Sequence, residues 1–327
     1  MTDLPTVGVV VATNRHGPYL AEALASVAAQ TYPAIDLVVV DDGSPDPEAV
    51  RRTAAAAGVR SLRLEPSGVS AARNAGVDHV AGELLVFLDD DDRWHPERIA
   101  RQVDALLARP DAVVSYCGMR SIDPEGSQIA PADQRQVADE HEVLRRRTGI
   151  VAPNVMVRRS AFDAVGRLDP ALRYGEDLDL VLRLALAGPF VFVPGPLVDY
   201  RAHASNVTRD YRPLALGIGR VLHAHLAAAR AAGRDDLVDD LRESLDAHAR
   251  WIAWSCVRAV RREAGERRWG AIPGELAWAA THAPTAPAAW VRGRRRQAGR
   301  PEPLGPAPSA TGAPGASPAL PRSCGPA

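Results

Sequence analysis

The chain has 327 residues with 39 basic and 40 acidic side chains, so its net charge of −1 favours neither nucleic acid nor any other charged partner. Every basic residue is arginine because the sequence contains no lysine, which excludes lysine-dependent chemistry such as a Schiff base or a P-loop. Three dispersed cysteines (Cys117, Cys256 and Cys324) form neither a disulfide framework nor a zinc site and are typical of a reducing cytoplasm. No signal peptide is expected from the acidic start, and no membrane span is expected because no apolar run reaches about 18 residues.

Apolar runs typical of buried strands alternate with helical patterns in the first third of the chain. "VGVVVAT" is almost entirely apolar, as expected for a parallel strand that is covered on both faces. Repeated β-α-β units of this length predict an open, mostly parallel sheet with right-handed crossovers. Pro96 is expected in the first turn of the fourth helix. The predicted strands span 7–13, 35–44, 59–65 and 83–90, and the predicted helices span 18–30, 47–58, 68–82 and 96–110.

The remaining sequence divides into three parts. Residues 111–205 read as the second half of the same α/β domain, with strands at 112–119 and 190–203 and helices at 159–166 and 176–188. A helical pattern rich in Ala and Arg follows, and the last residues are rich in Pro, Gly and Ala, a composition that favours disorder. We therefore expect an α/β domain at 1–210, a helical region at 211–292 and a disordered tail at 293–327.

Carboxylates follow two of the predicted strands directly. Asp41 and Asp42 end one strand, and Asp89–Asp92 end another. Ligands bind at the carboxyl ends of strands in open α/β sheets, and carboxylates crowded at such an edge are costly unless a cation is shared between them. Mg²⁺ or Mn²⁺ held by one or two carboxylates takes its other ligands from water and substrate phosphates. The acidic run therefore predicts a divalent metal that carries a diphosphate.

Five ordered segments resemble the inverting family 2 glycosyltransferases of GT-A fold. They are "VVVATNRHGPYLAEALASVAAQTYP", "DLVVVDDGSPD", "GVSAARNAGVDHVAGELLVFLDDDDRWHPERI", "VGRLDPALRYGEDLDLVLRLALAG" and "LVDYRAHASNVT". The resemblance covers about residues 5–210. It implies a non-processive enzyme built on a Rossmann-like mixed, mostly parallel sheet flanked by helices.

The resemblance also implies which residues bind the donor and the metal. In "FLDDDD", Asp91 is expected to ligate Mg²⁺ or Mn²⁺, and Asp89 is expected to belong to the same metal and donor site, near the ribose or a metal-bound water. Asp90, at a position where the family often has serine, is expected to contact the donor. Asp92 is expected to be structural, and His203 in "YRAH" to reach the metal or the diphosphate. The other expected donor contacts are Thr13, Asn14, Asp41, Asp42 and Arg73, with Asn74 supporting the loop.

The block "GEDLDLVLRLA" carries the expected chemistry. An acceptor hydroxyl needs a general base as it attacks, and one carboxylate placed opposite the leaving group gives single displacement with inversion. By resemblance Asp177 is this base, and Glu176 contacts the acceptor or orients the base. Asp179 and Arg183 stand four residues apart, which favours a plain helix-surface ion pair.

Two departures from the family pattern affect specificity. Val11, Ala12, Thr13 and Asn14 stand where the family usually has Pro-Thr-Tyr-Asn, so the aromatic residue expected to stack on the base is missing. A uracil or thymine ring offers an N–H donor to the carboxylates Asp41 and Asp42, which favours a UDP or dTDP sugar. Val181 stands where the family often has tryptophan, on the acceptor side.

The sequence leaves alternatives open. A non-catalytic nucleotide-binding or scaffold protein of the same fold, and a sugar-phosphate nucleotidyltransferase, remain the competing functions. The acceptor class is open as well, and nucleic-acid binding is not expected because the arginine patches are short. A cytoplasmic location is expected. The basic and aromatic segment near 248–269 is compatible with peripheral attachment to the inner face of a membrane, with a homodimer contact, or with ordinary packing on the main domain.

Overall fold

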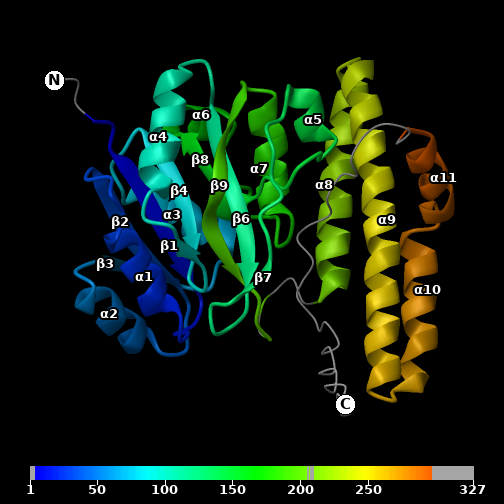
Figure 1. Ribbon diagram of the computed structural model, residues 1–327, viewed down its shortest axis with the longest axis horizontal. Helices are drawn as coiled ribbons and strands as arrows, with labels where there is room; N and C mark the ends of the chain where they lie inside the picture. Colours follow the sequence, from blue (N-terminus) through cyan, green and yellow to red (C-terminus); the bar gives the residue numbers. More distant parts are fainter. Residues whose placement is uncertain (1–3, 205, 207–209, 297–327) are drawn as a thin grey trace, which may run out of the picture.

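A mixed β-sheet organises the first two thirds of the protein. The computed structural model describes residues 4–204, 206 and 210–296. The strands are β1 (Val7–Thr13), β2 (Ile35–Asp42), β3 (Arg60–Leu64), β4 (Leu84–Asp89), β5 (Arg93–Trp94), β6 (Val114–Ile122), β7 (Gln128–Ala130), β8 (Val155–Arg158) and β9 (Phe190–Arg201). Their order is β3-β2-β1-β4-β8-β6-β9-β5, with β7 paired to β6 (Figure 1).

The two halves of the sheet differ in strand direction. Strands β3, β2, β1 and β4 are all parallel, as the β-α-β pattern predicts. Strand β8 is antiparallel to both β4 and β6, while β9 is parallel to β6. The expected GT-A-type mixed sheet is therefore confirmed, and β8 is the short strand that joins its halves.

Helices cover both faces of this sheet. Within the α/β domain they are α1 (Leu20–Ala28), α2 (Pro47–Ala56), α3 (Val69–Asp78), α4 (Arg98–Ala108), α5 (Glu140–Leu144), α6 (Arg159–Ala164) and α7 (Glu176–Ala185). Side chains alternate along β1, so Val9 and Val11 pack with α1 and α4, whereas Val10 packs in the core under α3, α6 and α7. The apolar runs of the sequence are continuous because both faces of the strands are buried.

The segment after the acidic run differs from the sequence prediction. Arg93 and Trp94 form β5, which pairs with β9, and α4 begins at Arg98, so the prediction of Pro96 in the first helical turn is wrong. The physical reason is tertiary. The buried Trp94 ring lies under the guanidinium of Arg98, 4.0 Å from its Cζ, which holds this segment extended against β9 before the helix starts.

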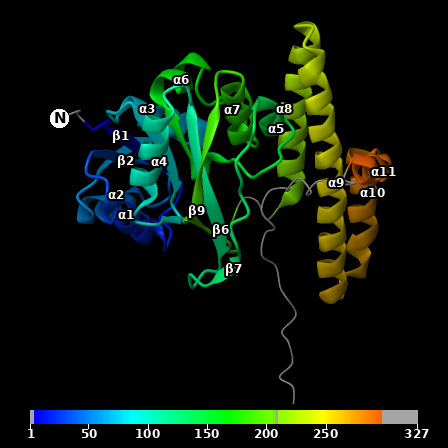
Figure 2. The same ribbon diagram turned by 45° about the horizontal axis from the view of Figure 1, so that its top comes forward.

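Four further helices stand beside the α/β domain: α8 (Tyr211–Ala231), α9 (Asp235–Gly265), α10 (Ile272–His282) and α11 (Ala286–Arg296). In both views α8 lies between the sheet and α9, and α10 and α11 lie on the outer side of α9 (Figures 1 and 2). Leu222 of α8 and Leu241 of α9 belong to the same core as Leu180 of α7. Four residues of the predicted tail, 293–296, belong to α11, and 297–327 lie outside the described residues. Within the described ranges, no helix is long and apolar enough to cross a membrane.

A glycine fixes how closely α8 approaches the loop before α7. A Cβ at Gly217 would lie 2.5 Å from both Cβ and the carbonyl oxygen of Tyr174, whereas a Cβ at Gly219 would meet Nε2 of His248 at 3.6 Å, an ordinary contact. Gly217 therefore permits close packing of α8 against the segment that leads into Glu176.

We expect Gly217→Ala to lower the free energy of unfolding by about 2 kcal/mol, because overpacking outweighs the better helix propensity of alanine. The matched variant Gly219→Ala on the same helix should keep or raise stability by up to about 1 kcal/mol. Urea denaturation followed by circular dichroism measures both. Equal effects of the two variants would contradict the close approach at Gly217.

His248 is a buried histidine at the contact between α8 and α9. Its Nε2 lies 3.0 Å from the carbonyl oxygen of Ala215, so this nitrogen carries the proton and the ring is neutral. Burial is the largest cause that lowers the pKa of His248, to about 3, and the charge of Arg146 adds to it.

In the unfolded state His248 binds a proton near pH 6.5, whereas in the folded state it does not. The contribution of His248 to the free energy of unfolding is therefore fully present above pH 6.5 and is lost as the pH falls toward 3. Between pH 7 and pH 5 the wild-type protein should lose about 2 kcal/mol through this residue. His248→Gln can still donate a hydrogen bond to the carbonyl oxygen of Ala215 but does not titrate. Its free energy of unfolding should therefore fall by about 2 kcal/mol less than that of the wild type between pH 7 and pH 5. Urea denaturation at both pH values tests this, and an identical pH dependence of the two proteins would refute it.

Candidate functional site

The candidate site lies where parallel strands β1, β2 and β4 end together. Thr13 is in register with Asp41, and Ala12 with Asp89, so the ends predicted from the sequence do meet at one edge of the sheet. Each carboxylate of the run Asp89–Asp92 turns to a different partner. This arrangement separates four like charges that adjacent positions would otherwise crowd together.

Asp89 faces the α3 helix. Its Oδ1 accepts from Nη2 of Arg73 at 2.5 Å, and the buried Arg73 also places Nη1 3.5 Å from Oε1 of Glu176. One guanidinium therefore connects the acidic run to the first residue of α7.

Asp90 and Asp91 face the end of β1 and the residues after it. Thr13 donates its hydroxyl to Asp90, and Arg15 places Nη2 3.6 Å from Oδ2 of Asp91. Nε2 of His203 lies 2.8 Å from the same Asp91 oxygen. Burial is the largest cause that raises the pKa of Asp90 and of Asp91, each to about 6. Asp91 and His203, far apart in sequence, are thus brought together as predicted.

The donor set partly fits a divalent metal. Asp91 and His203 offer a carboxylate oxygen and an imidazole nitrogen side by side. Across the described part of the chain, no three or more His, Cys, Asp or Glu side chains are grouped so that they could hold a metal ion by themselves. The pair suits an ion that takes most of its ligands from water and phosphate, as Mg²⁺ usually does.

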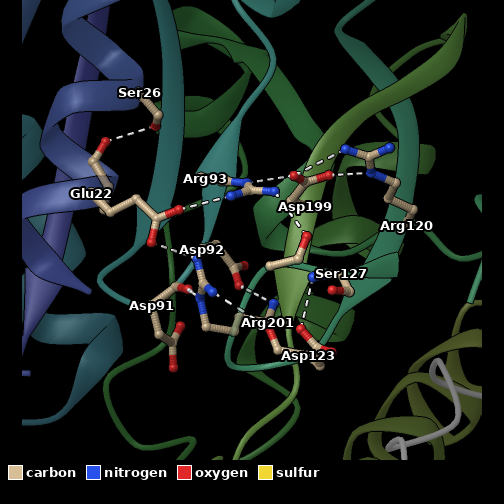
Figure 3. Close-up of polar contacts among 12 residues, drawn as sticks. Glu22, Ser26, Asp91, Asp92, Arg93, Arg120, Asp123, Ser127, Asp199 and Arg201 are labelled. Carbon is tan, nitrogen blue, oxygen red and sulfur yellow. Dashed lines mark hydrogen bonds and ion pairs between the residues drawn. The ribbon is translucent and has the colours of Figure 1, made fainter. Parts of the chain in front are cut away.

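Arg201 holds the acidic run in place from the end of β9. Its Nε donates to the carbonyl oxygen of Asp91 at 3.0 Å, its backbone N–H donates to Oδ1 of Asp92 at 2.9 Å, and Nη2 donates to Glu22 at 2.7 Å. Figure 3 shows Arg201 and Arg93 reaching Glu22 of α1 from two directions. Asp92 is buried, and burial first of all raises its pKa well above the usual range. The predicted structural role of Asp92 agrees with these contacts.

The predicted catalytic pair begins α7. Asp177 accepts from the backbone N–H of Leu178 at 2.7 Å. Burial is the largest cause that raises the pKa of Asp177 and that of Glu176, the latter to about 7 with a further contribution from Asp177. Arg73 opposes both shifts. Glu176 and Asp177 are therefore poorly solvated and lie near the Arg73 guanidinium, which also binds Asp89.

The other predicted residues occupy separate positions around this edge. Both oxygens of Asp41 are taken, by Ser44 and by Nη1 of Arg63 at 2.6 Å, and the oxygens of Asp42 accept from Ser67 and Gly68. In this arrangement the two carboxylates fix the turns after β2 and β3. Asn14 is exposed just after β1.

Two predictions of structural roles are confirmed. Asn74 donates its Nδ2 to the carbonyl oxygen of Leu168 at 2.8 Å and thereby supports the loop before α7. Asp179 and Arg183 form the expected ion pair at 2.6 Å, and His225 of α8 joins Asp179 at 2.8 Å.

Sequence reasoning missed Arg15, Glu22, Arg146 and Arg201. Arg201 belongs to the "YRAH" motif, so the sequence could have indicated that it lies near the site. Arg15 belongs to no motif that would indicate a role. Arg146 has a left-handed backbone with φ of 56°, and its Nη1 is buried with no hydrogen-bond partner within the described residues. Burial lowers the pKa of Arg146 to about 10, opposed by the charge of Asp177.

We expect Arg201→Met to lower the free energy of unfolding by about 2–4 kcal/mol, because the carbonyl oxygens of Asp91 and Pro124 lose their donor and Glu22 loses its buried ion-pair partner. Arg93→Met removes a partner of Glu22 and of Asp199, but Arg93 is only partly buried and Arg120 still pairs with Asp199, so its cost should be smaller, about 1 kcal/mol. Thermal and urea unfolding compare the two variants. A larger effect of Arg93→Met would contradict the assignment of Arg201 as the main support of the run.

The chain is similar in sequence to known glycosyltransferases. Residues 9–166 match the family described as Glycosyl transferase family 2. An uncharacterized glycosyltransferase of Rickettsia prowazekii is 27% identical over 217 residues, which cover 62% of this chain and 66% of that protein. The putative glycosyltransferase EpsH of Bacillus subtilis is 26% identical over 280 residues, covering 81% of this chain and 80% of that protein.

Solved structures show the same fold. The structure of S. aureus TarS 1–349 in complex with UDP-GlcNAc superposes with a TM-score of 0.60 at 15% sequence identity, covering 88% of this chain and 92% of that chain. Another structure of S. aureus TarS 1–349 gives a TM-score of 0.57 at 16% sequence identity, covering 88% of this chain and 92% of that chain. These matches show that the chain has the GT-A fold and that its residues 9–166 form a domain similar to glycosyl transferase family 2.

Proposed function

We propose that this domain transfers a sugar from a UDP- or dTDP-sugar to a hydroxyl acceptor, with inversion, and that it uses Mg²⁺ or Mn²⁺. The observation that carries the proposal is the bridge made by Arg73. Its guanidinium contacts Asp89 on the donor side and Glu176 at the start of α7, so the predicted donor and base residues form one continuous polar surface.

The donor side would be formed by the ends of β1, β4 and β9. Asp91 and His203 would hold the metal, which when bound stabilises the negative charge of the leaving diphosphate. Thr13 fixes Asp90, while Arg201 fixes the backbone of Asp91, so these side chains keep their positions before any ligand arrives. Prepositioned groups lower the barrier because they need no reorganisation during the reaction.

The acceptor side would be formed by α7. Asp177 accepts the proton of the attacking hydroxyl, and the Leu178 N–H that it already accepts orients its carboxylate. Glu176, whose pKa burial raises to about 7, would accept or donate a hydrogen bond to the acceptor. A single carboxylate base and a leaving group on the opposite side give one displacement, which inverts the anomeric centre.

The structural neighbour supports the class of donor. TarS has been crystallised with UDP-GlcNAc, and the shared fold makes a nucleotide sugar the first donor to test here. Asp41 and Asp42 each have one oxygen that accepts a single hydrogen bond, from the N–H of Ser44 and of Gly68, which leaves room for a further N–H such as that of uracil or thymine.

Calorimetric titration with UDP and dTDP, with and without Mn²⁺, tests the donor site. Binding should require the metal, and Asp91→Asn should weaken it at least about tenfold because a charged ligand is lost. Asp177→Asn should keep nucleotide affinity but lower kcat by about 10²–10⁴, the usual contribution of general base catalysis. Asp179→Asn, two residues further along α7, controls for the charge change.

Two results would reject the proposal. If a well-folded wild-type protein binds neither nucleotide with any divalent metal, the donor assignment fails. If Asp177→Asn and Asp179→Asn lower kcat equally, then Asp177 is not the base.

A further inference from the structure

Tryptophan and arginine are concentrated on the outer helices. Five of the six tryptophans lie between residues 251 and 290. Residues 250–296 contain ten arginines and three glutamates, a net charge of +7, whereas the chain as a whole carries −1. The rest of the molecule is therefore acidic, with −8, and the near-zero overall charge conceals a strongly basic segment.

The structure exposes a part of this segment as a mixed apolar and basic surface. Trp254, Val257 and Arg261 share one face of α9 because they are spaced by three and four residues. Trp254 is 49% and Val257 is 41% exposed, although the side chains are large and apolar. The Trp254 ring lies 6.0 Å from that of Trp290 on α11, and the residue that follows Trp290, Val291, is 54% exposed.

The basic character continues to the turn that ends α9. Trp269, in the short 3-10 helix Trp269–Ala271, is 64% exposed. Arg262 and Arg268 pair with Glu263. Arg261 and Arg267 are exposed and form no ion pair with any residue that the structure describes. We call Trp254, Val257, Arg261, Arg267, Trp269 and Val291 the outer helical surface.

We propose that the outer helical surface attaches the protein to an anionic lipid membrane. A layer of anionic lipid headgroups supplies the negative charge and the apolar environment that the exposed side chains of this surface can bind. Its negative charge attracts the unpaired arginines, and its boundary with the acyl chains accepts tryptophan and valine side chains. Figures 1 and 2 place α9–α11 on the far side of α8 from the sheet, so contact here leaves the strand ends uncovered.

The charge argues against the other occupants. A second copy of the chain docked through the same surface would bring two basic segments together, which is repulsive. A nucleic acid would satisfy the arginines, but its phosphate backbone offers no apolar layer to Val257 or Val291. Only the anionic lipid surface matches charge and apolar exposure together.

The test is co-sedimentation of the full chain with vesicles of phosphatidylcholine alone and of phosphatidylcholine mixed with phosphatidylglycerol. The wild-type protein should bind the mixed vesicles, bind the neutral ones far more weakly, and dissociate as salt is raised. Arg261→Gln combined with Arg267→Gln should weaken binding about thirtyfold, since each arginine near an anionic surface contributes about 1 kcal/mol and 1.4 kcal/mol is tenfold. Trp254→Ala combined with Trp269→Ala should weaken it at least about tenfold.

Matched controls separate this surface from general charge or stickiness. Arg52→Gln with Arg230→Gln makes the same charge change at exposed arginines elsewhere, and Leu107→Ala with Leu186→Ala removes apolar groups that are 52% and 51% exposed on the α/β domain. Both controls should bind like the wild type. Circular dichroism melting confirms that every variant is folded.

Several outcomes would overturn the proposal. They are no binding to mixed vesicles, equal binding to neutral and mixed vesicles, and equal losses in the controls. A concentration-dependent dimer that Trp254→Ala abolishes, without vesicle binding, would assign the surface to a second copy instead. None of these measurements depends on nucleotide binding, so the outcome is independent of the proposed transferase activity.

Discussion

The crowding of four carboxylates at the end of β4 is the constraint around which the site is arranged. Adjacent aspartates in a buried turn repel one another and lose solvation, which raises the pKa of Asp90, Asp91 and Asp92. Each carboxylate contacts a partner from a different element. Arg73 of α3 binds Asp89, and Thr13 of β1 binds Asp90. Arg201, at the end of β9, binds Asp92, and His203, just after β9, binds Asp91. The charge is distributed rather than neutralised at one point.

This distribution explains why distant parts of the chain depend on each other. Arg201 connects the acidic run to Glu22 of α1 and to the loop after β6, and Arg93 joins Glu22 to Asp199 of β9. The short strand β5 exists because these side chains and the buried Trp94 hold it against β9. A turn that several elements hold keeps Asp91 and His203 adjacent, and side chains that are already in position need little reorganisation when a ligand binds.

The helical region has two distinct faces with different physical roles. Its inner face completes the core, because Leu222 and Leu241 pack with Leu180, and Gly217 allows α8 to reach the loop before Glu176. Its outer face carries exposed tryptophans and arginines that packing does not require. The inner contacts join these helices to the segment that leads into α7, whereas the exposed outer residues form the surface for which we propose membrane attachment.

The sequence alone determined the parallel half of the sheet, because uninterrupted apolar strands that alternate with amphipathic helices are local signals. It also determined which residues cluster, since parallel strands end at one edge and five motifs occur in a fixed order. Only the tertiary structure decided the short strands β5 and β8 and the partners of each carboxylate. Several of these features depend on contacts between residues more than 60 positions apart, such as Asp92 with Arg201 and Thr13 with Asp90. Such pairings have no local pattern, because a single arginine or threonine has the same appearance in sequence whether it faces solvent or a buried carboxylate.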